Sequence, residues 1–137
     1  MAGVRRYDPA AVNGGRGMAL EALLLEIVVE QKERYTLCRP VGELDAYTVG
    51  QFRDALSELA TTERLLIDLS EVPFMDSSGL GALIGGIRRA READGDVTVA
   101  CSRPTLTRLL HTTGFDRIVA VEDTVEAAAA ALLDPVE

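Results

Sequence analysis

Short apolar runs typical of strands alternate with helical patterns along most of this chain of 137 residues. In residues 23–29 every odd-numbered position is apolar, and a second strand-like run at residues 35–41 follows a polar turn, which predicts an antiparallel hairpin. Beyond residue 44, a helical pattern separates each expected strand from the next, which favours parallel strands with helices on their faces. We therefore expect an α/β fold whose mixed, mostly parallel sheet has an opening β-hairpin and covering helices.

The elements expected after the hairpin have recognisable boundaries. Strands are expected at residues 65–69, 97–101 and 118–121, and the first of these is apolar enough to be covered on both faces. Helices are expected after a capping box at residues 48–51, from Ser77 to near Gly95, between Pro104 and Gly114, and from a second capping box at residues 123–126 to Leu133. Asp68 interrupts the covered strand, so we expect it to find a polar partner near the strand end.

Composition narrows the classes of partner. The chain carries 22 acidic and 14 basic residues, a net charge of −8, so a basic face for nucleic acid is not expected. No apolar run approaches the roughly 20 residues of a membrane span, and the first residues lack the apolar stretch of a signal peptide. Cys38 and Cys101 have no CxxC or CxxH spacing and are expected to be small core residues in a reducing compartment. These features predict a cytoplasmic protein without nucleic-acid or membrane partners.

The beginning of the chain differs in composition from the rest. Glycines and a proline are frequent in the first 17 residues, and no apolar periodicity is present there. We therefore expect residues 1–20 to form a flexible N-terminal tail. Residues 21–137 are expected to form a single domain, because their number suits one hydrophobic core.

The sequence contains few candidates for catalysis. The single histidine, His111, falls away from the apolar face of its expected helix and is expected to point to solvent. A nucleotide hydrolase is one alternative, because the glycine-rich helix start at Ser77 would offer backbone amides to a phosphate. No phosphate-loop motif is present, and the only lysine, Lys32, lies far from that segment in sequence. We expect no enzyme activity, no metal site and no cofactor.

One segment concentrates polar groups at an expected helix start. Residues 74–81, Phe-Met-Asp-Ser-Ser-Gly-Leu-Gly, place a carboxylate and two hydroxyls at the beginning of the helix. The simplest interpretation is that Asp76 or Ser77 caps the helix and contributes about 1 kcal/mol. Capping does not account for the second serine, or for two glycines that each weaken the first turn by up to about 1 kcal/mol. The segment is therefore a candidate functional site.

The same helix has an outward face, which we call the outward stripe. Five of its residues lie within about 80° of one another, on a different side from the apolar residues. These residues are Ser78, Gly81, Gly85, Arg88 and Glu92. Glycines on this face would leave a shallow surface on which side chains of another protein could settle. Close helix packing within the fold is the alternative for Gly85 and Gly86.

Two segments together resemble the signatures of a known family. Gly42-Glu43-Leu44-Asp45 precedes an expected helix, and Asp76-Ser77-Ser78-Gly79-Leu80-Gly81 opens the next helix after a strand. In this order the segments resemble those of STAS-domain anti-sigma factor antagonists, and the resemblance covers about residues 23–133. It implies a STAS-type fold and a bacterial regulator that binds an anti-sigma factor, itself a serine kinase, and thereby frees a sigma factor. It also implies that phosphorylation by this kinase inactivates the protein, and that a serine phosphatase reverses the modification.

The resemblance also assigns roles to single residues. The phosphorylated serine of the family falls on Ser77, and Ser78 takes the neighbouring hydroxyl position. Asp45 matches an acidic residue near the kinase-facing surface, and Asp76 precedes the acceptor. The surface expected to contact the partner consists of Asp45, Asp76, Ser78, Gly79, Gly81, Gly85 and Arg88. ATP and magnesium would belong to the kinase, so no cofactor is expected in this chain.

A different STAS setting is the main alternative. A binding subunit of a transport or stress-sensing assembly would use the same fold and the same helix face without a sigma factor. Co-purification with a transporter ATPase instead of a kinase would select this alternative.

Overall fold

The computed structural model describes residues 3–7 and 25–134. These residues contain a six-stranded sheet whose strands follow chain order. The strands are β1 (Gly3–Tyr7), β2 (Leu25–Gln31), β3 (Thr36–Gly42), β4 (Arg64–Asp68), β5 (Asp96–Ala100) and β6 (Ala120–Glu122). The helices are α3 (Val49–Glu58), α4 (Ser77–Glu92), α5 (Pro104–Thr112) and α6 (Val125–Leu133), with a short 3-10 helix at Phe115–Arg117.

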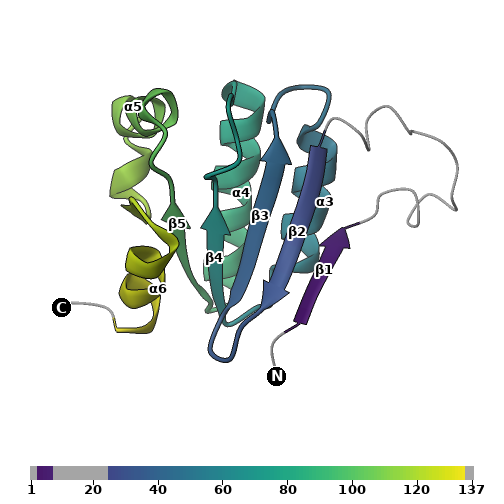
Figure 1. Cartoon of the computed structure of the whole chain (residues 1–137), viewed down its shortest axis with the longest axis vertical. Coiled ribbons are helices and arrows are strands. Elements are labelled where there is room, and N and C mark those ends of the chain that lie inside the picture. The colour runs from purple at the N-terminus through teal and green to yellow at the C-terminus, as the bar shows by residue number, and fades with distance from the viewer. Residues whose placement is uncertain (1–2, 8–24, 135–137) are drawn as a thin grey trace, which may run out of the picture.

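The strand directions confirm the predicted mixed sheet. β2 and β3 form an antiparallel hairpin in which Val29 pairs with Cys38, whereas β3, β4, β5 and β6 pair in parallel. Helices α3 and α4 lie on one face of the sheet, and α6 covers the other face near β4 and β5 (Figure 1). Because β3 and β4 point the same way, the loops that precede α3 and α4 lie at the same edge of the sheet.

A strand lies within the segment that the sequence predicts to be a flexible tail. Residues Gly3–Tyr7 form β1, which pairs antiparallel with β2, so the prediction is wrong for these residues. The sequence Gly-Val-Arg-Arg-Tyr shows no apolar alternation, but the hydrogen bonds that hold an edge strand come from the backbone, which every sequence carries. Residues 8–24 lie outside the described residues, so the domain boundary after residue 20 stays a prediction.

The core has two parts that share the sheet. The larger cluster lies under α3 and α4 and takes Ile67 from β4, whereas a smaller cluster under α6 packs Leu66 of β4 with Leu132. β4 is therefore covered on both faces, as its apolar run predicts. Cys38 and Cys101 belong to the larger cluster, which confirms the prediction that they are core residues.

Two helix starts differ from their predicted capping boxes. The Thr48 hydroxyl does not cap α3; it donates to the Glu43 carbonyl oxygen at 2.7 Å and accepts from the Asp45 N–H at 3.1 Å. It therefore ties together the loop before the helix, and the capping-box prediction is wrong there. At α6 the Thr124 hydroxyl accepts from the Ala127 N–H at 3.0 Å, so the cap lies one residue later than predicted.

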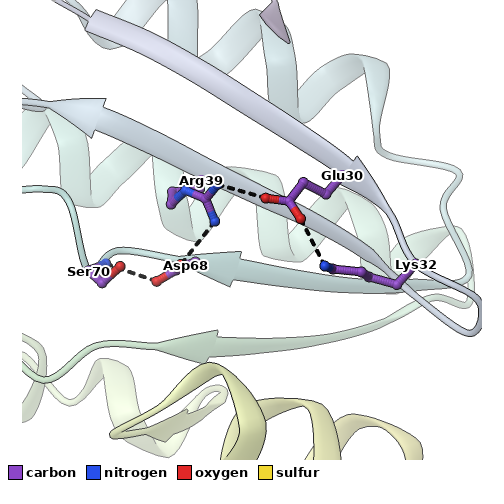
Figure 2. Close-up of polar contacts among 5 residues, drawn as sticks. All are labelled: Glu30, Lys32, Arg39, Asp68 and Ser70. Carbon is purple, nitrogen blue, oxygen red and sulfur yellow. Dashed lines mark hydrogen bonds and ion pairs between the residues drawn. The ribbon is translucent and has the colours of Figure 1, made fainter. Parts of the chain in front are cut away.

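Charged side chains on three adjacent strands and in the turn between β2 and β3 form a linked cluster (Figure 2). The buried Asp68 carboxylate accepts from the Ser70 N–H at 3.0 Å and lies 3.6 Å from the Arg39 guanidinium. Arg39 also donates to Glu30 at 2.7 Å, and the Lys32 ammonium lies 2.8 Å from Glu30. Asp68 thus has the partner near its strand end that the sequence predicts. Hydrogen bonds from Lys32 and Arg39 hold the pKa of Glu30 below its ordinary value.

This cluster predicts a pH-dependent contribution to stability. Because folding lowers the pKa of Glu30, the stabilisation is complete above the ordinary pKa of a glutamate and is lost as the pH falls through the folded value. Glu30→Gln should therefore lower the free energy of unfolding by about 1 kcal/mol at neutral pH, and by progressively less below about pH 4. Denaturant unfolding of both proteins at a series of pH values measures this difference.

A matched control is available in the turn that follows β2. Glu33 is exposed and is not part of the cluster, so Glu33→Gln should change stability little at neutral pH. A loss of stability in Glu30→Gln that stays constant down to about pH 3 would contradict the ion-pair explanation.

Candidate functional site

Two loops at the carboxyl ends of β3 and β4 lie side by side (Figure 1). The Leu44 N–H donates to the Phe74 carbonyl oxygen at 3.0 Å, and the Leu44 carbonyl oxygen accepts from the Asp76 N–H at 3.1 Å. These bonds form a short parallel bridge between Leu44 and Met75. Segments 42–45 and 76–81, which are far apart in sequence, therefore meet at one place in the fold.

Gly79 allows this close approach. A Cβ at position 79 would lie 2.6 Å from the Leu44 carbonyl oxygen and 2.9 Å from the Met75 Cγ. Both separations are too short for a real contact, so a larger residue would push the two loops apart. Gly79 is buried, so its missing side chain serves the packing of the loops, and its contact with a partner stays a prediction.

Asp76 is the N-cap of α4. Of the two capping residues that the sequence allows, Asp76 and Ser77, the structure therefore selects the first. The Asp76 carboxylate accepts from the Ser78 N–H at 2.8 Å and from the Gly79 N–H at 3.1 Å. Its extended backbone, with φ −100° and ψ −171°, is typical of an N-cap. Ser77 is consequently the first residue of the helix, and it is exposed. Another protein can therefore reach its hydroxyl.

Asp45 organises the neighbouring loop. Its carboxylate accepts from the Tyr47 N–H at 2.9 Å and from the Thr48 N–H at 3.2 Å, which closes a turn just before α3. Because Leu44 pairs with Met75, Asp45 and Asp76 occupy corresponding positions, each one residue beyond the bridge. The site therefore carries two partly exposed carboxylates and an exposed hydroxyl.

The outward stripe of α4 is open along most of its length. Gly81 and Arg88 are exposed, whereas Ser78 and Gly85 are half-buried. A Cβ at Gly81 would meet no heavy atom within 4 Å outside the backbone of its own helix, and one at Gly85 would meet only the Arg89 guanidinium, at 3.6 Å. These positions leave the backbone of α4 accessible from outside, as the sequence predicts.

Gly86 differs from the two glycines of the stripe. A Cβ at this position would lie 2.5 Å from Cδ1 of Leu56, which belongs to α3. Close packing of α4 on α3 therefore accounts for Gly86, but it does not account for Gly85.

Two exposed aromatic residues flank the site. From the sequence, Phe74 is included in the candidate segment without a role, and Tyr47 is not singled out. Tyr47 is 78% exposed and Phe74 is 49% exposed. Tyr47 follows Asp45 by two residues, and Phe74 precedes Asp76 by two residues. The sequence carries a signal for them, because both stand beside a signature segment and outside the apolar periodicity of any helix or strand.

Other residues that could carry chemistry lie on other elements. His111 on α5 is exposed, as predicted, and its Nδ1 lies 2.9 Å from an Asp116 carboxylate oxygen. Burial raises the pKa of the Cys101 thiol, which keeps it protonated at neutral pH. In residues 3–7 and 25–134, no group of three or more His, Cys, Asp or Glu side chains could hold a metal ion. Within the same ranges, every helix is too short or too polar to cross a membrane.

The surroundings of Gly79 and Gly81 predict opposite effects of the same substitution. Gly79→Ala should lower the free energy of unfolding by about 1–3 kcal/mol, because the added methyl group collides with a backbone oxygen. Gly81→Ala should raise it by up to about 1 kcal/mol, because alanine favours the helix and the position is open. Urea denaturation of both variants measures the two changes. Equal effects would contradict the role assigned to Gly79.

The chain is similar to proteins of one family. The family model described as STAS domain matches residues 26–128. The anti-sigma-B factor antagonist of Listeria monocytogenes is 33% identical over 104 residues, which cover 72% of this chain and 91% of the relative. The crystal structure of an anti-sigma factor antagonist from Mycobacterium paratuberculosis matches with a TM-score of 0.75 and 27% identity, over 80% of this chain and 95% of that protein. The Bacillus cell fate determinant SpoIIAA in its phosphorylated form matches with a TM-score of 0.59 and 25% identity, over 75% of this chain and 96% of that protein.

Proposed function

Because the chain belongs to the STAS domain family, which includes its anti-sigma factor antagonist relatives, we propose that it is an anti-sigma factor antagonist controlled by phosphorylation of Ser77. Its partner would be an anti-sigma factor that is also a serine kinase, and binding this partner would free a sigma factor. The observation that carries the proposal is the exposed Ser77 at the first position of α4, where the outward stripe begins. The phosphorylated form of the related SpoIIAA supports such a modification.

The proposed contact surface combines the two bridged loops with the outward stripe. The two carboxylates lie beside Ser77 at one end, Ser78 borders them, and Arg88 lies toward the other end of α4. Between these ends, Gly81 and Gly85 leave the helix backbone open, so that side chains of a partner can approach it closely.

A phosphate on Ser77 should leave the fold intact. It adds about −1.5 to −2 charges at a helix N-terminus, where the helix dipole favours an anion. Because Ser77 is exposed, the phosphate requires no rearrangement of the core. A partner packed on this surface would instead face a bulky anion next to Asp45 and Asp76. A penalty of roughly 3 kcal/mol would weaken binding more than about 100-fold.

Other proteins would supply the remaining parts of the cycle. The kinase would bring ATP and magnesium, and a serine phosphatase would remove the phosphate from Ser77. We place this cycle in the cytoplasm, where sigma factors act.

Phosphorylation in vitro tests the proposal directly. The purified protein is incubated with ATP, magnesium and each anti-sigma factor kinase encoded by the same genome, and its intact mass and modified peptide are determined. We expect one phosphate on Ser77 in the wild type and none in Ser77→Ala. Ser70→Ala, which changes an exposed serine before the site, is the control and should be modified like the wild type. Stoichiometric phosphorylation of Ser77→Ala, or mapping of the phosphate to Ser78, would overturn the assignment.

A charge at position 77 should act on binding and not on folding. Ser77→Asp should weaken the complex with the kinase at least about tenfold, because it introduces an anion on the contact surface. Its melting temperature should stay close to that of the wild type, because Ser77 is exposed. Calorimetric titration and thermal unfolding measure the two quantities.

Two results would count against this mechanism. A large loss of stability in Ser77→Asp would show that the charge acts through the fold. A stable complex with a transporter ATPase, together with no phosphorylation by any of the kinases, would favour the binding subunit of a transport or stress-sensing assembly.

A further inference from the structure

Two exposed aromatic side chains lie on the loops that surround the proposed acceptor. In the part of the chain that the structure describes, the large apolar residues with high exposure are Val4, Tyr47, Phe74 and Ile118. Tyr47 and Phe74 come from the two bridged loops, and Phe74 lies three residues before Ser77. We call these two residues the aromatic pair.

Three other aromatic residues are less exposed than the aromatic pair. Phe52 and Phe115 are fully buried, and Tyr35 is partly buried against the smaller core cluster. The core therefore takes up aromatic rings elsewhere, whereas Tyr47 and Phe74 are left 78% and 49% exposed. Exposed aromatic rings gain most when another protein covers them, because each can bury about 150–250 Å².

The backbone of the aromatic pair is fixed before any partner arrives. The Tyr47 N–H donates to the Asp45 carboxylate at 2.9 Å, and the Phe74 carbonyl oxygen accepts from the Leu44 N–H at 3.0 Å. The loops that carry the rings are joined by the bridge at Leu44 and Met75. Binding would therefore order only the side chains, which lowers the entropic cost of association.

We propose that the aromatic pair anchors the anti-sigma factor kinase, by inserting into an apolar recess beside the active site of that kinase. This inference rests on the proposed function, and it names the side chains that supply affinity next to the acceptor. The partner chemistry follows from continuity: the rings lie on the same loops as Asp45, Asp76 and Ser77, so a kinase that reaches the hydroxyl also covers them. Aromatic residues at the centre of an interface commonly carry most of its binding energy.

The aromatic pair should act on binding and not on phosphoryl transfer. Neither ring belongs to the residue that accepts the phosphate, so truncation should raise the KM for phosphorylation of Ser77 and leave kcat nearly unchanged. A merely structural role would show itself in the melting temperature instead. The two measurements therefore separate an anchor from a residue that maintains the fold.

The experiment uses the full chain and each anti-sigma factor kinase encoded by the same genome. The variants are Tyr47→Ala and Phe74→Ala, with Tyr47→Phe as the conservative replacement. Val4→Ala is the matched control, because Val4 is 68% exposed and lies on β1, outside the two loops and the outward stripe. Dissociation constants, steady-state phosphorylation kinetics and melting temperatures are measured for each protein.

We expect each alanine variant of the aromatic pair to raise Kd and KM about tenfold or more, whereas Tyr47→Phe and Val4→Ala stay within about threefold of the wild type. If both alanine variants bind the kinase and are phosphorylated like the wild type, the anchoring role of the aromatic pair is overturned. The proposed function would then still stand. Equal losses of binding in Val4→Ala would overturn the anchoring role as well. If no kinase binds or phosphorylates the wild type, the proposed function is wrong, and so is the anchoring role of the aromatic pair. Binding that depends on the pair without phosphorylation would support the anchor and overturn the phosphorylation cycle.

Discussion

The peptide groups on either side of Leu44 make the contact on which the rest of the site depends. The Leu44 N–H and carbonyl oxygen both bond to the β4–α4 loop, so the β3–α3 loop is fixed at two points. The Leu44 side chain is fully buried, and Gly79 leaves the space that the carbonyl oxygen needs. Loops at strand ends are commonly mobile, but these two are tied into one unit because each satisfies backbone groups of the other. The carboxylates, the Ser77 hydroxyl and the aromatic pair all take their positions from this contact.

The cap of α4 bears on how a phosphate at Ser77 would act. Asp76 already accepts from the Ser78 and Gly79 N–H groups, which are amides that an anion at the helix start would use. In the proposed cycle, a phosphate on Ser77 would therefore meet the helix dipole without these donors, and it would lie beside a carboxylate. We infer that it would point away from the fold, toward the partner. It would repel the partner at the contact surface, and it would not form hydrogen bonds with the helix start.

Apolar periodicity and capping preferences were sufficient to predict the hairpin, the parallel strands and the helix that starts at Ser77, because neighbouring residues determine these features. The predictions fail where a distant segment decides the outcome. β1 forms because β2 offers a free edge, and its own sequence does not show this. The role of Gly79 depends on the Leu44 carbonyl oxygen, which lies far away in sequence. The exposure of Tyr47 and Phe74 also depends on distant contacts. An aromatic residue in a loop can be buried or exposed, and the position of the loop in the fold decides which.

The 16-residue helix α4 contains four glycines. The packing of the fold requires two of them and does not require the other two. Gly79 and Gly86 face the neighbouring loop and α3 at distances where a Cβ does not fit, so packing accounts for them. A Cβ at Gly81 would face open space and one at Gly85 would make only an ordinary contact with the Arg89 guanidinium, so alanine would fit at both positions and would favour the helix. Together these two glycines weaken the helix by about 2 kcal/mol, and the fold by itself gives no reason for them. In the proposed function, a partner that approaches the α4 backbone closely would supply that reason, on the face next to Ser77.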